Sequence, residues 1–203
     1  MKTPKFAFAA LAAALALTAC KDSTAPGAPA TPADSVAAPE KTTPVSIDAI
    51  KSSATGFTVG SSMSTRTVYV FFDPQCPHCA ALWNSAKPLR SQAKFVWIPV
   101  AIMNKSSTTQ GATILAAKDP VAAMDEHETS LLAKGGGISA ASGTEAQQAQ
   151  IKKNTDLMNR FGFSSIPSLV TQNAQTGAIV KNEGSLPTPA LAAFIGVPAP
   201  AGQ

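Results

Sequence analysis

A pair of cysteines, Cys76 and Cys79, constrains the fold of this chain more than any other feature. The pair closely follows residues 67–72 (TVYVFF), whose β-branched and aromatic side chains predict a strand buried on both faces. Pro77 suits the first position of a helix, because no backbone hydrogen bond is lost there. The pattern predicts a buried strand, a turn at Asp73-Pro74 and a helix that begins near Cys76.

The elements after this turn alternate in type. The first helix is expected to run to about Gln92, with Pro88 kinking it or ending it early. Residues 94–102 (KFVWIPVAI) predict a second buried strand. The order indicates an α/β thioredoxin fold, with a helical insertion at about residues 105–161 between its βαβ and ββα units. The later elements are expected as helices at 112–117, 121–132 and 145–161, a hairpin of 168–171 and 178–181, and a helix at 189–195 stopped by Gly196.

Two cysteines separated by two residues occur in zinc sites, in redox-active pairs and in metal-carrying loops. A structural zinc site needs four ligands, and His127 is the one further good donor besides His78 of the motif. His127 stands in the acidic segment 125–128 and is expected on the surface among carboxylates. The pattern therefore favours a redox-active disulfide between Cys76 and Cys79, with no metal and no other cofactor.

The expected position of Cys76 favours its ionised form. At the start of a helix, unpaired backbone N–H groups and the helix dipole stabilise an anion. Pro77 and His78, between the two sulfurs, are expected to tune this thiolate further. A stabilised thiolate makes the disulfide easier to reduce, so we expect a pair toward the oxidising end of the known range.

The N-terminal segment predicts export. Two early lysines precede residues 6–17, an apolar run that is too short for a membrane-spanning helix. The run closes on Leu17-Thr18-Ala19-Cys20, which resembles the lipobox of bacterial lipoproteins. We expect residues 1–19 to be a lipoprotein signal peptide and Cys20 to carry lipid. The alternative is ordinary secretory cleavage near Ala19, which would leave Cys20 as a lone thiol.

Residues 20–45 are rich in Pro, Ala, Thr and Ser and predict a disordered tether before a catalytic domain at 46–203. Removal of Lys2 and Lys5 would leave 14 basic against 12 acidic residues, a net charge of about +2. No cluster of Lys and Arg is interleaved with aromatic residues, so no nucleic-acid partner is expected.

From about Thr67 to Ile195 the chain resembles the DsbC/DsbG family of periplasmic thiol–disulfide interchange proteins, and its DsbG members more closely. The resemblance rests on the segment from Asp73 to Cys79, on residues 112–120 (ATILAAKDP) and on Ile166-Pro167. It implies that Cys76 forms mixed disulfides with substrates and that Cys79 resolves them. It also implies a cis bond before Pro167, with Ile166 and Pro167 lining the substrate groove.

The resemblance also sets expectations about partners and location. These are exported proteins with cysteines as substrates, a membrane redox partner that resets the pair, and the periplasm. Lys21 after the lipidated cysteine weakly favours the outer membrane. The family's N-terminal dimerisation domain does not fit between Cys20 and the first strand, so a monomer is expected. Ile166 stands where the family often has Thr.

The function expected from these features is disulfide exchange with exported proteins, in the direction of an oxidase, a reductase or an isomerase. Two alternatives remain open. One is a copper(I)-handling protein that binds the metal through Cys76 and Cys79, since thiolates are soft ligands. The other is an assembly factor dedicated to one complex of the cell envelope.

Overall fold

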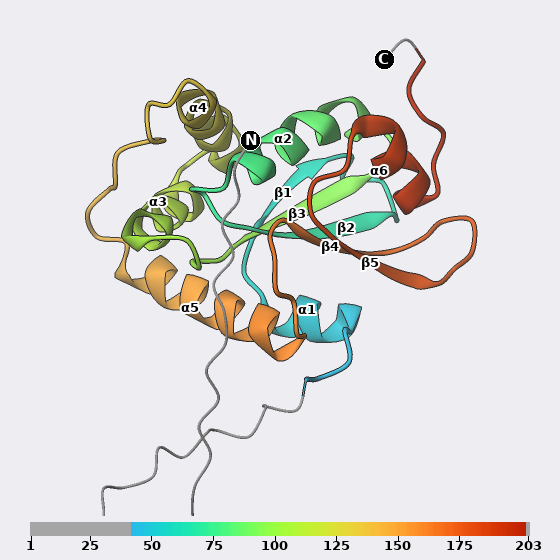
Figure 1. Ribbon diagram of the computed structural model, residues 1–203, viewed down its shortest axis with the longest axis horizontal. Coiled ribbons are helices and arrows are strands. Elements are labelled where there is room, and N and C mark those ends of the chain that lie inside the picture. The colour runs from blue at the N-terminus through green and yellow to red at the C-terminus, as the bar shows by residue number, and fades with distance from the viewer. Residues whose placement is uncertain (1–41, 202–203) are drawn as a thin grey trace, which may run out of the picture. The chain divides into compact units, whose positions relative to one another are not determined.

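The computed structural model describes residues 42–201 (Figure 1). The predicted signal peptide at 1–19, Cys20 and the tether up to residue 41 lie outside the described residues. Near the start of the described residues, the N–H of Thr43 donates to the carbonyl of Arg160 at 2.6 Å. None of the helices within residues 42–201 combines the length and the apolar character that crossing a membrane requires.

Five strands form one mixed sheet in the order β1-β3-β2-β4-β5. Strand β2 is central, parallel to β3 and antiparallel to β4. The described elements, in chain order, are α1 (Ile47–Ser53), β1 (Phe57–Gly60), β2 (Thr67–Phe72), α2 (Pro77–Ala86), the 3-10 helix η1 (Lys87–Leu89), β3 (Lys94–Pro99), α3 (Lys105–Ala116), α4 (Pro120–Leu132), α5 (Glu145–Arg160), β4 (Ser168–Gln172), β5 (Ile179–Glu183) and α6 (Thr188–Ile195).

This topology confirms the predicted thioredoxin fold. The β2–α2–β3 segment is a βαβ unit, and the antiparallel β4 and β5 lead into α6. Helices α3, α4 and α5 form the insertion between these units. Gly196 ends α6 in the left-handed conformation, with φ at 81°, as expected for a helix stop.

Several boundaries differ from the sequence expectation. Helix α2 ends at Ala86, because Pro88 cannot continue the α-helical hydrogen bonds and falls in a 3-10 turn. Strand β3 ends at Pro99 rather than at residue 102, and α3 begins at Lys105 rather than at 112. The side chain of Asn104 caps α3 by accepting the N–H of Ser106 at 2.8 Å. Helix α1 and strand β1 were not expected at all.

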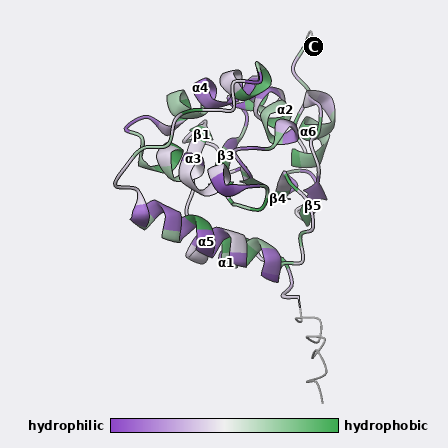
Figure 2. Cartoon of the chain, turned by 60° about the vertical axis from the view of Figure 1, so that its left-hand side comes forward, coloured by the Kyte–Doolittle hydropathy of each residue, from purple (hydrophilic) through white to green (hydrophobic). Residues whose placement is uncertain are grey.

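Helices cover both faces of the sheet (Figure 1). Helices α2, α4 and α6 lie on one face, over an apolar core that includes Phe72, Trp83 and both cysteines. Helices α1 and α5 lie on the other, over a second core built on Phe71. Figure 2 shows α5 coloured mostly hydrophilic, in keeping with a helix that presents one face to solvent.

Polar contacts of Asp125 join helix α4 of the insertion to the βαβ unit. The indole N–H of Trp83 in α2 donates to Asp125 in α4 at 2.7 Å, and Lys87 pairs with the same carboxylate at 2.9 Å. Helix α4 is thereby held against the helix that carries the cysteine pair.

Candidate active site

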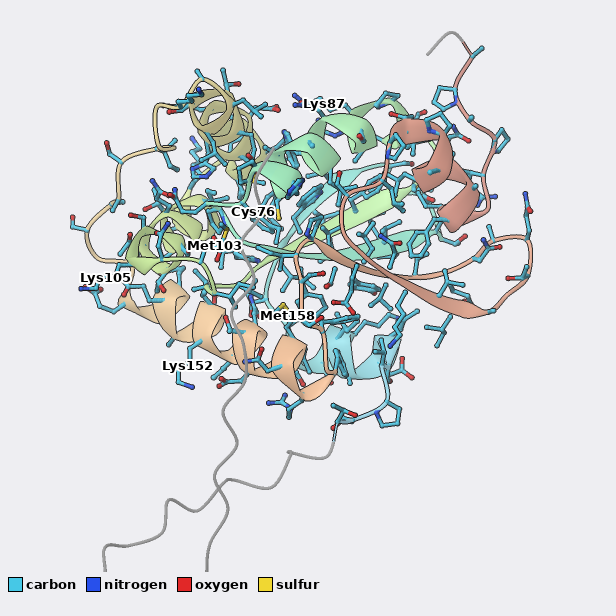
Figure 3. All side chains as sticks on the ribbon, viewed as in Figure 1. Cys76, Lys87, Met103, Lys105, Lys152 and Met158 are labelled. Atoms are coloured by element: carbon cyan, nitrogen blue, oxygen red, sulfur yellow. The ribbon has the colours of Figure 1, made fainter. Side chains whose placement is uncertain are left out.

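Cys76, labelled in Figure 3, and Cys79 lie at the start of α2, shortly after the chain leaves β2. Cys76 is the N-cap residue, in extended conformation, and Pro77 follows it in the first turn. The N–H of Cys76 donates to the carbonyl of Asp73 at 3.0 Å, which closes the turn between strand and helix. Cys76 is 4% exposed and Cys79 is fully buried, so one sulfur faces the surface more than the other.

The two thiols differ strongly in acidity. The hydrogen bond from the Cys79 thiol lowers the pKa of Cys76 to about 6, helped by the backbone N–H groups of Cys79 and His78 and by the charge of His78. Burial raises the pKa of Cys79 well above its ordinary value. Both residues are unpaired thiols, so the structure describes the reduced pair. Near neutral pH, Cys76 is the thiolate and Cys79 keeps its proton.

The predicted proline turn lies against the cysteine pair. The Ile166–Pro167 peptide bond is cis, as expected. The carbonyl oxygen of Ile166 lies 3.9 Å from Sγ of Cys76, at the outer limit of a thiol hydrogen bond. Cys76 and Ile166 are 90 positions apart, and the sheet brings them together because β4 pairs with β2.

The other predicted site residues are placed as follows. Pro77 and His78 are exposed on the first turn of α2, beside Cys76. Cys20 lies outside the described residues. Among residues 42–201, no three His, Cys, Asp or Glu side chains gather in a way that could hold a metal ion.

Asp73 organises the loop before the pair. Its side chain is fully buried, and Oδ1 accepts the N–H of Gln75 at 2.9 Å. Oδ2 accepts the N–H groups of Ile102 and Met103, at 2.8 and 3.0 Å. One carboxylate therefore ties the loop after β2 to the loop after β3.

The expectation for His127 was wrong. Its side chain is fully buried rather than at the surface. The Nε2 atom lies 2.6 Å from the carbonyl oxygen of Pro74, and the N–H of Ile138 donates to Nδ1 at 3.2 Å. Burial lowers the pKa of His127 and keeps the ring neutral. Met124 and His127 are three residues apart on α4, so helical periodicity could have indicated this buried position.

Glu128 is a second residue that sequence reasoning missed. It is 2% exposed, and neither carboxyl oxygen has a hydrogen-bond partner within residues 42–201. Burial raises the pKa of Glu128 to about 8, and the negative charge of Cys76 adds to the rise. The charge of Glu128 in turn raises the pKa of Cys79. A protonatable carboxyl thus lies within electrostatic reach of both thiols.

Residues 59–196 match the thioredoxin-like domain family. The chain is 32% identical over 143 residues to the thiol:disulfide interchange protein DsbG of Pseudomonas aeruginosa, covering 68% of this chain and 54% of that protein. It is also 32% identical over 107 residues to DsbG of Escherichia coli, covering 50% and 42%. The chain spans about half the length of the curated relatives that it matches.

Solved structures agree with this assignment at the level of the fold. The catalytic domain of Proteus mirabilis ScsC superposes with a TM-score of 0.57 at 16% identity, covering 73% of this chain and 91% of that one. Pseudomonas aeruginosa DsbA2 superposes with a TM-score of 0.56 at 21% identity, covering 68% and 91%. The matched residues, 59–196, include the cysteine pair, the cis-proline turn and the inserted helices. The chain belongs to the thioredoxin-like domain family.

Proposed function

We propose that this protein is a thiol–disulfide oxidoreductase that exchanges disulfides with exported proteins through Cys76 and Cys79. The observation that carries the proposal is the contrast between the two thiols. Cys76 has a pKa lowered to about 6, whereas burial raises the pKa of Cys79. Since the thiolate is the attacking species, one sulfur is prepared for nucleophilic attack and the other for a later step.

The exchange proceeds in two balanced steps. The Cys76 thiolate attacks one sulfur of a substrate disulfide, forms a mixed disulfide and releases the other substrate sulfur as a thiolate. Cys79 then loses its proton and attacks Sγ of Cys76, which closes the Cys76–Cys79 disulfide and releases the second substrate thiolate. The substrate gains two electrons and the protein loses two. The reverse sequence oxidises a substrate dithiol.

The turn at Pro167 is proposed to receive the substrate chain. The Ile166 carbonyl lies beside Sγ of Cys76 and is available as an acceptor for a substrate backbone N–H. Such a bond would hold the substrate backbone next to the attacking sulfur, which favours attack by fixing its orientation.

The direction of exchange is proposed to favour substrate oxidation. Reactive cysteines in such motifs titrate between about 3.5 and 7, and lower values go with stronger oxidants. The pKa of Cys76, about 6, lies below that of an ordinary thiol but nearer to the upper end of this range, which supports a moderately oxidising disulfide rather than a strongly oxidising one. An equilibrium with glutathione measures this directly. A pair that stays oxidised in a strongly reducing mixture would instead assign the protein to reductive repair.

The location is proposed as the periplasm, with a lipid on Cys20 and with residues 20–45 as the tether. The lipobox-like segment before Cys20 supports the anchor, and Lys21 supports the outer membrane. A membrane redox partner would reset the pair, and the protein would act as a monomer. Metabolic labelling with a lipid precursor, compared between the parent and a Cys20→Ser variant, tests the anchor.

Trapping of mixed disulfides tests the function itself. In a Cys79→Ala variant, Cys76 can still attack but the second step cannot occur, so exported proteins should accumulate in disulfide linkage to Cys76. The matched control is Cys76→Ala/Cys79→Ala, which keeps any trapping through Cys20 and removes trapping at the pair. Equal capture by the two variants would contradict the proposal.

A further inference from the structure

The loop that precedes Cys76 is held from outside the βαβ unit. Its backbone turns at Asp73, Pro74 and Gln75, and Pro74 is buried. The N–H of Gln75 is already bound within the loop by Oδ1 of Asp73, at 2.9 Å. The carbonyl of Pro74 is bound instead by His127 of the helical insertion, at 2.6 Å. Both ends of the Pro74–Gln75 peptide group are therefore fixed.

The hydrogen bonds of His127 define its protonation state. The backbone N–H of Ile138 can only donate, so Nδ1 must accept and carries no proton. The carbonyl of Pro74 can only accept, so Nε2 must carry the proton and donate. The imidazole is thus the neutral Nε2–H tautomer, with each nitrogen paired to a backbone group from a different segment.

The loop around Gly137 leaves space for the imidazole ring of His127. Gly137 has φ at +90°, and a Cβ atom built on it would overlap Cε1 of His127. The side-chain amide of Gln110 in α3 donates to the carbonyls of Gly136 and Ile138, at 2.8 and 2.9 Å. These bonds hold the loop around Gly137 against the imidazole.

The same loop contacts the residue next to Cys76. The side-chain nitrogen Nε2 of Gln75 donates to the carbonyl of Gly136 at 3.1 Å, and it also donates to Oε1 of Gln110. Pro74 and Gln75, the two residues directly before Cys76, are thus both bound to the helical insertion. One is bound through its backbone by His127, and the other through its side chain.

We propose that His127 is a positioning residue for the Cys76 thiolate: by donating from Nε2 to the Pro74 carbonyl, it fixes the backbone that aims Sγ at the first N–H groups of α2. The inference rests on the proposed function of Cys76 as the attacking sulfur. Its physical basis is that hydrogen bonds to a thiolate weaken steeply as distance and angle depart from their optimum. A loop released from His127 samples positions in which the N–H groups of His78 and Cys79 bind Sγ less well.

The test compares three variants of the full chain. His127→Leu keeps the apolar bulk and removes both ring nitrogens, while His127→Gln retains an amide N–H that can reach the Pro74 carbonyl. Met124→Leu is the matched control, because Met124 is also fully buried on α4 and the substitution preserves volume. The readout is the pH dependence of Cys76 alkylation by iodoacetamide, resolved from Cys20 and Cys79 by peptide mass spectrometry.

We expect the pKa of Cys76 to rise by about one unit in His127→Leu, which is an alkylation rate about tenfold lower at pH 5. His127→Gln should recover most of this loss, and Met124→Leu should leave the pKa near that of the parent. A folded His127→Leu variant with the parent pKa of Cys76 would overturn the proposal.

If His127→Leu does not fold, His127→Asn serves as the second variant, because its shorter amide stays polar but does not extend as far toward the Pro74 carbonyl as Nε2 of the ring does. A raised pKa of Cys76 supports the proposal there, and an unchanged pKa overturns it. The alkylation assay needs no substrate protein. Failure of the positioning role is therefore distinct from failure of the proposed exchange activity, which the trapping experiment reports.

Discussion

One face of the sheet packs against α1 and α5, and the other packs against α2, α4 and α6 (Figure 1). Each face buries a polar side chain from the insertion. On the first, Asn154 accepts the N–H of Thr55 at 2.9 Å and donates to the carbonyls of Thr55 and Pro99, at 2.8 and 2.9 Å. On the second, Glu128 has no hydrogen-bond partner within residues 42–201.

These two buried side chains have different roles, because one is fully hydrogen-bonded and does not titrate, whereas the other can change its charge. A buried side-chain amide with its hydrogen bonds satisfied joins the chain segments that it contacts, and it does not titrate near neutral pH. A buried carboxyl without partners destabilises the fold when charged, and its raised pKa makes it responsive to nearby thiols. The face with α1 and α5 therefore supports the sheet, while the face with α4 carries the groups that change charge.

The largest expected effect is on exchange. A Cys76→Ser variant should lose disulfide exchange down to the uncatalysed rate, because a serine hydroxyl is not ionised near neutral pH and forms no disulfide. The assay is reduction of a disulfide-linked peptide by the reduced protein. Cys20→Ser is the control and should retain the parent rate. Residual exchange in Cys76→Ser would indicate that another cysteine can replace Cys76.

Phe71 and Phe72 are neighbours on β2 that point to opposite faces, and both are fully buried. Replacing either with Ala should lower the free energy of unfolding by about 3–5 kcal/mol, as measured by urea denaturation. We expect only Phe72→Ala to change the pKa of Cys76, because Phe72 shares a core with both cysteines. Equal shifts in the two variants would show that the faces are not independent.

Glu128→Gln should make stability less dependent on pH. The pKa of Glu128 is raised from 4.5 to about 8, so the folded state holds this proton more tightly than the unfolded state. This tighter proton binding stabilises the folded state fully below pH 4.5, and the stabilisation is lost as the pH rises through about 8. At pH 9 we expect the glutamine variant to be more stable than the parent by about 1–3 kcal/mol.

The matched control for Glu128→Gln is Glu126→Gln, at an exposed position two residues earlier on α4. Urea denaturation of both variants at pH 5 and pH 9 should show a pH-dependent gain for Glu128→Gln alone. A constant difference between the glutamine variant and the parent at the two pH values would mean that Glu128 does not titrate in this range.

The smallest effect is expected on the outer side of α5. Lys152 pairs with Asp156 at 2.8 Å, four residues along the helix, and both side chains are well exposed. Lys152→Ala should lower the free energy of unfolding by no more than about 0.5 kcal/mol, since exposed pairs are screened by water. The alkylation profile of Cys76 should not move. A larger loss would indicate a role of this helix face in packing or binding.

Elements with a strong local pattern could be predicted from sequence. Strand β2 was placed at its observed limits, and Pro88 and Gly196 marked the ends of helical segments. Strand β1 could not be placed, because it has four residues and is held mainly by its antiparallel pairing with β3. Such pairing depends on residues distant in sequence, which no local window contains.

At the candidate site, the amino-acid sequence by itself determined the cysteine pair, its place after a buried strand and the proline turn that faces it. These follow from residue type and short spacing. Only the tertiary structure decided that Glu128 is buried near that pair and which backbone groups the buried His127 meets. Their neighbours on the chain are charged, but helix α4 turns these two inward, and the cost of burying them depends on the atoms that they meet.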